Sequence, residues 1–268
     1  MSKIEINNVT LDYVDKNSTF TALKDVSISI EEGEFVCIIG SSGCGKSSLL
    51  SILEGLNFPT EGNVNIDGSE IKGTGFDRAV VFQHYSLFPW MTVRKNVAYG
   101  IRQVNKNLPR KNLFEIADKF LSKVGLNNFK QKYPSQLSGG MQQRVAIARA
   151  LAMSPSILLM DEPFGAVDAK NRVILREMLL ELWEKSEEKK TVVFVTHDID
   201  EAILLSDRVI MMTSNPGRVR KEIKIDFPRP RNREGLMQTK AYLNFRKELM
   251  SSFFEDIAEK IGGEEVAI

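Results

Sequence analysis

The segment that most constrains this chain is the run of residues 40–47, which reads GSSGCGKS. This spacing of glycines before Lys46 and Ser47 is typical of a loop whose backbone N–H groups surround phosphate oxygens. Apolar residues 35–39 precede the loop and residues 48–53 follow it, which predicts a strand, the loop and a helix in that order. The helix N-terminus adds partial positive charge. We therefore predict a nucleoside triphosphate site.

Within this loop we expect the Lys46 amine to reach the β- and γ-phosphates and the Ser47 hydroxyl to ligate magnesium. The remaining nucleotide-binding residues predicted here are Ser41, Ser42, Gly43, Cys44, Gly45 and Ser48. Cys44 lies beside a helix N-terminus and Lys46, both of which favour a thiolate. We expect its thiol to be open to modification.

A second helix start follows at residues 137–144, which read LSGGMQQR. Ser138 is a natural N-cap for a helix over residues 145–152, and Gly139 and Gly140 permit a close backbone approach. This segment resembles the LSGGQ signature of the ATP-binding cassette (ABC) ATPases, with Met141 where that family most often has Gln. The resemblance implies that Ser138, Gly139 and Gly140 contact ATP.

Three further strand ends strengthen this resemblance. Asp161 and Glu162 follow the apolar strand of residues 157–160, and a carboxylate at such a strand end is suited to holding magnesium. The family places its general base at Glu162. It also implies a histidine at His197 that contacts the γ-phosphate and a glutamine at Gln83 that touches magnesium and water.

Two other positions match the family. Residues 165–168, GAVD, resemble the loop that crosses the dimer interface and place Asp168 near the nucleotide. Tyr13 matches the aromatic residue on which cassettes stack adenine, and stacking of this kind contributes roughly 1–3 kcal/mol. The alternative for Tyr13 is a tyrosine on an edge strand that packs locally.

Composition limits the function classes. The net charge of +1 gives no reason to expect nucleic acid as a partner, and 43% hydrophobic with 26% charged residues is typical of a globular protein. An apolar run of about 18 residues, as a transmembrane helix requires, does not occur. The start, MSKIE, is charged and does not resemble a secretory signal. Cys37 and Cys44 are expected to be reduced thiols.

The alternation of strand-like and helix-like segments along the chain predicts an α/β fold. The resemblance specifies a P-loop NTPase (RecA-like) core with a parallel sheet, an N-terminal antiparallel β part and an inserted α-helical subdomain. We expect an ABC ATPase domain over residues 1–215. Its nucleotide-binding core takes residues 1–83 and 156–215, and its helical subdomain residues 84–155.

Residues 216–268 are predicted to form a basic linker and a C-terminal amphipathic helix. The basic excess is expected to be a solvated face, with contact to anionic lipid as the alternative. Apolar residues recur at every fourth position of the helix, so it is expected to dock on the core. These residues are Phe245, Leu249, Phe253, Ile257 and Ile261.

The resemblance implies an ATP-hydrolysing subunit that uses ATP and Mg²⁺. Residues 84–93, HYSLFPWMTV, resemble the LLPWLTV stretch of importers for nitrate, sulfonates and taurine. The expected partners are a second copy in a homodimer, transmembrane permease subunits and, indirectly, a solute-binding protein. The expected location is the cytoplasmic face of the membrane, as a peripheral subunit.

Three alternatives remain at this point. One is the cassette of an exporter or lipoprotein-extraction complex. Another is a DNA-repair or ribosome-associated ATPase, although the long coiled coil or second cassette of those proteins does not appear in this sequence. The third concerns Phe88, Pro89 and Trp90, which either contact a permease or simply pack the helical subdomain.

Overall fold

The computed structural model describes residues 2–16, 18–186, 188–231 and 233–264, with side chains described up to Phe253. The chain divides into two units, one of residues 1–73 and 194–268 and the other of residues 74–193. Among the described residues, none of the helices has the length and apolar character needed to cross a membrane.

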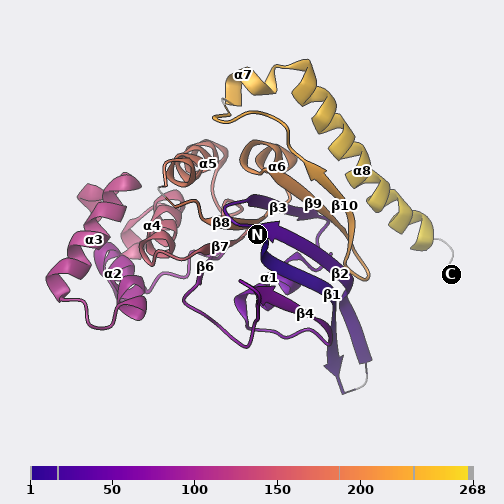
Figure 1. Cartoon of the computed structure of the whole chain (residues 1–268). Coiled ribbons are helices and arrows are strands. Elements are labelled where there is room, and N and C mark those ends of the chain that lie inside the picture. The colour runs from indigo at the N-terminus through magenta and orange to yellow at the C-terminus, as the bar shows by residue number, and fades with distance from the viewer. Residues whose placement is uncertain (1, 17, 187, 232, 265–268) are drawn as a thin grey trace. The chain divides into compact units, whose positions relative to one another are not determined.

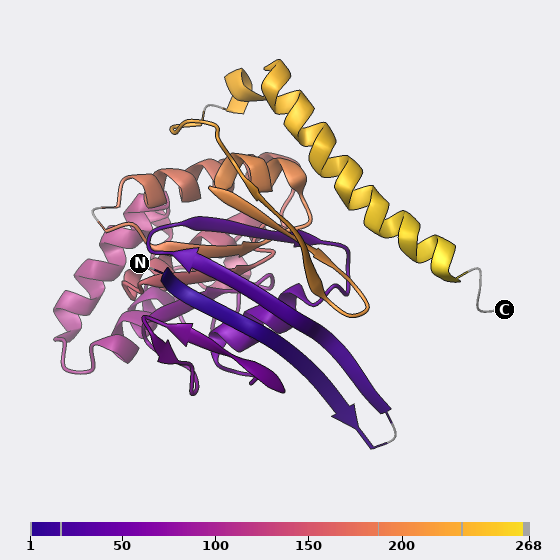
Figure 2. The same ribbon diagram turned by 45° about the vertical axis from the view of Figure 1, so that its right-hand side comes forward.

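The first unit contains an antiparallel sheet with the strand order β2-β1-β4-β5. In β1 and β2 apolar side chains alternate with polar ones over much of their length, and this alternation buries one face of the hairpin, including Ile4 and Ile6. Figure 2 shows β1 and β2 as a long paired ribbon. Its strands are β1 (Ser2–Asp15), β2 (Ser18–Glu31), β4 (Glu61–Ile66) and β5 (Ser69–Glu70).

A second group of strands in this unit follows the order β10-β9-β3. All six residues of β3 (Phe35–Gly40) are buried, as expected for a strand covered on both faces. It pairs in parallel with β9 (Arg208–Thr213), and β10 (Arg218–Lys224) pairs antiparallel with β9. The helices of the unit are α1 (Lys46–Glu54), α6 (Ile199–Leu205), α7 (Arg233–Met237) and α8 (Lys240–Glu264).

The C-terminal part of this unit differs from the expected basic linker in two respects. Residues 218–224 form a strand because they pair with β9 along its edge. The expectation of a solvated basic face is wrong for Arg231, which is 8% exposed, and for Arg229, whose side chain is 17% exposed. Burial of both guanidinium groups is possible because they donate hydrogen bonds to backbone carbonyl groups.

Helix α8 docks through part of the predicted apolar face. Leu249 is 1% exposed and Phe245 contacts Phe227, with ring centroids 5.8 Å apart. Tyr242, which the fourfold spacing does not include, is fully buried. The side chains of Ile257 and Ile261 lie outside the described residues. Figure 1 shows α8 beside β10, and Lys221 of β10 pairs with Glu248 of α8.

The second unit combines a few strands with a cluster of helices. Strand β6 (Arg78–Val81) pairs in parallel with β7 (Ile157–Asp161), and β8 (Thr191–Val195) leads the chain back toward the first unit. The helices are α2 (Val93–Val104), α3 (Arg110–Lys123), α4 (Gly139–Ala152) and α5 (Ala169–Glu184), with short 3₁₀ turns at Asn127–Phe129 and Pro134–Gln136.

The helices α2, α3 and α4 bury a common apolar core that includes Val97, Leu121 and Val145. This core explains why residues 84–155 read as helical, since each helix supplies one apolar stripe. The elements are those of the predicted α/β class. The domain boundaries given above remain a prediction.

Candidate active site

The phosphate-binding loop joins β3 to α1 in the first unit, as its sequence predicts. Gly43 and Gly45 have φ angles of +78° and +89°, in the left-handed region that glycine adopts without strain. Gly45 is the N-cap of α1 and has no side chain with which to cap the helix. The N–H groups of the first turn lack acceptors within a helix, so this end is suited to an anion.

Lys46 is held inside the loop. Its side chain is buried, and its Nζ donates hydrogen bonds to the backbone oxygens of Gly40 at 2.9 Å and Ser41 at 3.0 Å. Cys44 Sγ lies 3.7 Å from the same nitrogen. The structure thus concentrates one positive charge at the centre of the loop.

Residues after β9 support the loop from outside. Ser214 Oγ lies 3.2 Å from Ser41 Oγ, and the Gly217 N–H donates to Ala22 O at 3.0 Å. A Cβ atom at Gly217 would lie 2.4 Å from Cys44 O, so only glycine fits there. Sequence reasoning missed this contact because it joins residues that are far apart in the sequence.

Tyr13 lies beside the start of α1. Tyr13 is 42% exposed, and its hydroxyl is 3.3 Å from Ser48 Oγ and accepts a hydrogen bond from Asn57 Nδ2 at 3.3 Å. The structure therefore brings an open aromatic face close to the predicted phosphate-binding loop.

His197 follows β8 and is exposed. Its two neighbours are fixed by hydrogen bonds: the Thr196 N–H donates to Ile38 O at 3.2 Å, and Asp198 caps α6 by accepting from the backbone N–H of Asp200 and Glu201. The buried Thr196 hydroxyl also donates to Glu201 at 2.7 Å. The imidazole is thus presented from a rigid turn.

In the second unit, Gln83 and Glu162 meet at Gly165. A Cβ atom built on Gly165 would lie 3.1 Å from Gln83 Nε2 and 3.7 Å from Glu162 Oε2. The Gly165 N–H donates to Glu162 O at 3.0 Å. Glu162 has a φ of +41°, which is uncommon for a residue with a side chain. Asp161, at the end of β7, is only partly buried.

The signature segment is organised by its neighbours. Ser138 caps α4, as predicted, by accepting from the Met141 N–H at 3.4 Å. A Cβ at Gly139 would lie 2.6 Å from the Tyr85 hydroxyl, which is 3.4 Å from Ala166 O. Sequence reasoning missed the role of Tyr85, whose contact depends on the folded second unit.

Asp168 and Asn171 form the last part of this arrangement. Asp168 caps α5 by accepting from the Asn171 backbone at 3.0 Å and its side-chain amide at 2.6 Å, and these bonds lower the pKa of the Asp168 carboxyl. A Cβ at Gly140 would lie 3.1 Å from Asn171. Asp168 is therefore tied to the signature glycines through Asn171.

Each unit thus gathers its own share of the predicted residues. The first unit holds Tyr13, the loop of residues 40–48 and His197, whereas the second holds Gln83, Asp161, Glu162, Ser138, Gly139, Gly140 and Asp168. Comparison with known families shows to which family the chain belongs. The family model described as ABC transporter matches residues 23–165. The chain belongs to the ABC transporter family.

Relatives of this ABC protein are similar along almost the whole chain. An uncharacterised ABC transporter ATP-binding protein of Methanocaldococcus jannaschii is 48% identical over 259 residues, covering 97% of this chain and 94% of that protein. The nitrate import ATP-binding protein NrtD of Synechocystis is 46% identical over 234 residues, 86% of each chain. The bicarbonate transport ATP-binding protein CmpD of Synechococcus elongatus is 44% identical and covers 94% of this chain and 91% of that protein.

Solved cassettes share the fold. The dimeric structure of the ATP-binding cassette MJ0796, described as a post-hydrolysis state bound to ADP and Pi, is 38% identical with a TM-score of 0.74. It covers 84% of this chain and is itself covered completely. The predictions of a P-loop NTPase fold and of an ABC ATPase are confirmed, and ATP is the nucleotide.

The burial of Cys44 contradicts the expectation that its thiol is open to modification. Both Cys44 and Cys37 are 0% exposed, and burial raises the pKa of the Cys37 thiol far above its usual range. We therefore expect native protein to react slowly with Ellman's reagent and both thiols to react at once in denaturant. A thiol that reacts rapidly before unfolding would contradict the burial of Cys44.

Gly165 leaves little space for a side chain beside Gln83 and Glu162. Gly165→Ala should push on the Gln83 amide and lower the turnover number for ATP by about tenfold, since misplacing reactive groups by less than an ångström is costly. Gly235→Ala is the matched control, because nothing lies within 4 Å of a Cβ there. Steady-state phosphate release measures both, and equal rates in the two variants would argue against the Gln83–Gly165–Glu162 arrangement.

Proposed function

We propose that this chain is the ATP-hydrolysing subunit of an importer that moves a small anion, such as nitrate, bicarbonate or a sulfonate, through a separate permease. The observation that carries this proposal is the similarity of 44–46% along most of the chain to subunits named for nitrate import and bicarbonate transport. No feature of the described residues favours export or lipoprotein extraction.

The first unit supplies the nucleotide-binding half of the site. The N–H groups of the loop and of the first turn of α1 receive the phosphates, and Lys46 exchanges its bonds to Gly40 and Ser41 for bonds to phosphate oxygens. The half-exposed ring of Tyr13 stacks on adenine. His197 contacts the γ-phosphate from its fixed turn.

Magnesium fits the residues that the family implies. By the family resemblance, the Ser47 hydroxyl, the Asp161 carboxylate and the Gln83 amide oxygen would hold the ion, and all three are hard oxygen ligands. Magnesium usually takes only one or two carboxylates and completes its shell with water and substrate phosphates. Among the described residues no group of three or more His, Cys, Asp and Glu side chains could hold a metal by itself. When bound, the ion neutralises charge on the phosphates.

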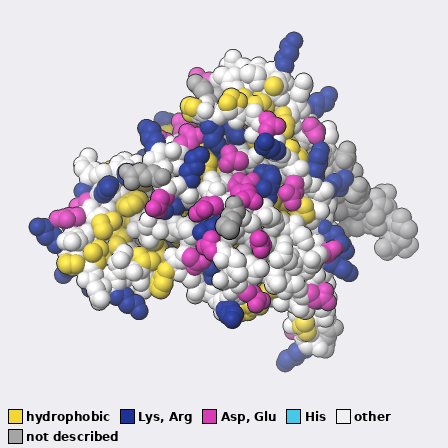
Figure 3. Space-filling model, viewed as in Figure 1, with side chains coloured by type: hydrophobic (Ala, Val, Ile, Leu, Met, Phe, Trp, Pro, Cys, Tyr) yellow, Lys and Arg dark blue, Asp and Glu magenta, His cyan; other side chains and the backbone are white. Residues whose placement is uncertain are grey.

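Hydrolysis is assigned to the second unit. Glu162 is the general base that accepts a proton from the attacking water, and Gln83 orients that water. The proximity of both side chains to Gly165 supports this assignment, because the base and the group that orients the water must act on the same water molecule. Figure 3 shows charges of both signs dispersed over one face of the chain.

A second copy of the chain completes each site. Ser138, Gly139 and Gly140 of one copy cover the ATP held by the loop of the other, and Asp168 lies at the interface between copies. The dimeric structures of MJ0796 support this arrangement. The proposal includes a peripheral location on the cytoplasmic face of the membrane and an indirect link to a solute-binding protein.

The permease is proposed to dock on the loop that follows Gln83. The fully buried Asn96 amide accepts from Phe88 N at 2.8 Å and donates to the backbone oxygens of Phe88, Met91 and Thr92. These bonds hold a tight turn at whose tip Trp90 is 69% exposed. Figure 3 shows hydrophobic side chains gathered over the helical part of the second unit.

Arg149 ties the same loop to the signature helix. Its guanidinium donates to Ser86 O at 2.8 Å and Tyr85 O at 3.3 Å, and burial lowers the pKa of Arg149. The loop that begins at the catalytic Gln83 is therefore connected both to α4 and to the proposed permease surface. This connection supplies a route from ATP to the permease.

Glu162→Gln tests the enzymatic role. The substitution keeps the shape of the side chain and removes the base, so we expect the turnover number to fall by about 10²- to 10⁴-fold while ATP still binds. Trapped ATP should hold the dimer closed. Steady-state phosphate release and size-exclusion chromatography with ATP measure both effects. Glu177→Gln, on the exposed face of α5, is the control, and near-normal turnover of Glu162→Gln would remove this residue from the base role.

Trp90→Ala tests the docking surface. Truncation of an aromatic anchor costs about 2 kcal/mol or more at an interface, so permease pull-down and ATP-driven uptake should both fall. The isolated variant should bind ATP normally. Phe76→Ala, at a site 60% exposed, is the matched control. Unchanged permease capture by Trp90→Ala would show that the ring only packs the subdomain.

A further inference from the structure

The C-terminal end of α6 is capped by two arginines from the chain that follows β10. Arg231 donates to the backbone oxygens of Ile203 at 2.9 Å and Leu204 at 3.4 Å, and also to Ser206 O. Arg229 donates to Leu205 O. The last carbonyl groups of a helix lack partners within it, and these guanidinium groups satisfy them.

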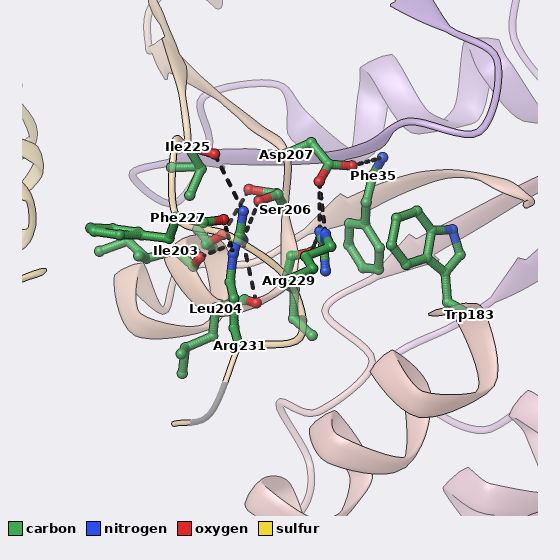
Figure 4. Close-up of polar contacts among 12 residues, drawn as sticks. Phe35, Trp183, Ile203, Leu204, Ser206, Asp207, Ile225, Phe227, Arg229 and Arg231 are labelled. Carbon is green, nitrogen blue, oxygen red and sulfur yellow. Dashed lines mark hydrogen bonds and ion pairs between the residues drawn. The ribbon is translucent and has the colours of Figure 1, made fainter. Parts of the chain in front are cut away.

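The arginines are enclosed rather than laid on the surface. Arg231 also donates to Phe227 O at 3.1 Å and Ile225 O at 3.3 Å, in its own segment. Figure 4 shows its guanidinium group surrounded by these carbonyl oxygens. Arg229 pairs with Asp207 at 2.8 Å, and Asp207 accepts from the Phe35 N–H at 3.0 Å, at the first residue of β3. One cluster thus joins this segment, α6 and β3.

The other end of α6 is held by α8. Asp200, in the first turn of α6, accepts from the hydroxyl of the fully buried Tyr242 at 2.7 Å and from Arg246 Nε at 2.7 Å. The bond to Asp200 raises the pKa of Arg246. Residues 225–231 and 240–249, here called the C-terminal strap, therefore hold α6 at both ends.

The position of α6 bears directly on His197. The helix has only seven residues, and helices shorter than about 12 residues are marginal without outside contacts. Asp198, the residue after His197, is the N-cap of α6, and Thr196 bonds to Glu201 within it. A shift of α6 therefore moves the turn that carries the imidazole.

We propose that the C-terminal strap fixes α6 and thereby places His197 for ATP hydrolysis, with Asp200, Tyr242 and Arg246 as positioning residues. This inference rests on the proposed role of His197. None of the three residues lies in the loop or touches the reacting atoms by that proposal. Their loss should therefore reduce turnover more than nucleotide affinity.

The test compares full-length Asp200→Asn, Arg246→Met and Tyr242→Phe with the wild type. We expect kcat for Mg-ATP hydrolysis to fall by about tenfold in the first two, and less in the third, with KM for ATP nearly unchanged. Arg246→Lys, which keeps a charged donor, should recover part of the loss. Glu248→Gln is the matched control, since it breaks only the exposed pair of α8 with Lys221.

A His197→Ala background separates positioning from general damage. In that background the strap variants should cause no further loss of the residual turnover, because their effect passes through the imidazole. Wild-type kcat in both Asp200→Asn and Arg246→Met would overturn the proposal, as would a full additional loss in the His197→Ala background.

The folding of the variants and the proposed role of His197 are checked separately. If Asp200→Asn does not fold, the comparison of Arg246→Met with Arg246→Lys decides, and equal kcat values in those two would count against the strap. His197→Ala alone with wild-type turnover would contradict the proposed role of His197 and, with it, this inference. Loss of activity in His197→Ala with unaffected strap variants would leave the proposed function intact and overturn only the inference.

Discussion

Asp207 makes the contact on which the first unit most depends. Its backbone N–H donates to Phe35 O at 2.7 Å and its carboxylate accepts from Phe35 N–H at 3.0 Å, so both backbone groups at the start of β3 are fixed. Strand β3 ends in the phosphate-binding loop. Close packing makes the fully buried strand β3 nearly rigid. The anchored position of Phe35 therefore determines the position of Gly40, at which the loop begins.

Much of this architecture could be predicted because local chemistry determines it. The strand-loop-helix order around residues 35–53 follows from apolar runs and glycines, and the Ser138 cap follows from the preference of N-caps for short hydroxyl side chains. The family signature then assigned nucleotide-binding roles to residues far apart in sequence. Composition alone supported only a globular protein.

The remainder depended on contacts that local patterns do not encode. The arginines after Phe227 were expected to lie on the surface. Two of them instead donate hydrogen bonds to carbonyl groups at the end of α6, which lack partners within the helix. Cys44 seemed reactive from its neighbours in sequence, but tertiary packing encloses it. Tyr242 did not fit the fourfold spacing, and its burial is explained by a polar partner, Asp200, on another helix.

The Asn96 amide holds the turn of residues 88–92, which is the proposed docking surface for the permease. All the bonds from its amide go to main-chain atoms, so the course of residues 88–92 does not depend on which side chains the tip carries. The exposed Trp90 side chain can therefore be exchanged while the backbone beneath it stays in place. The buried amide separates the shape of the loop from its surface chemistry. On the proposed docking surface, pairing with a different permease would then require a change of exposed side chain rather than a new course of the loop backbone.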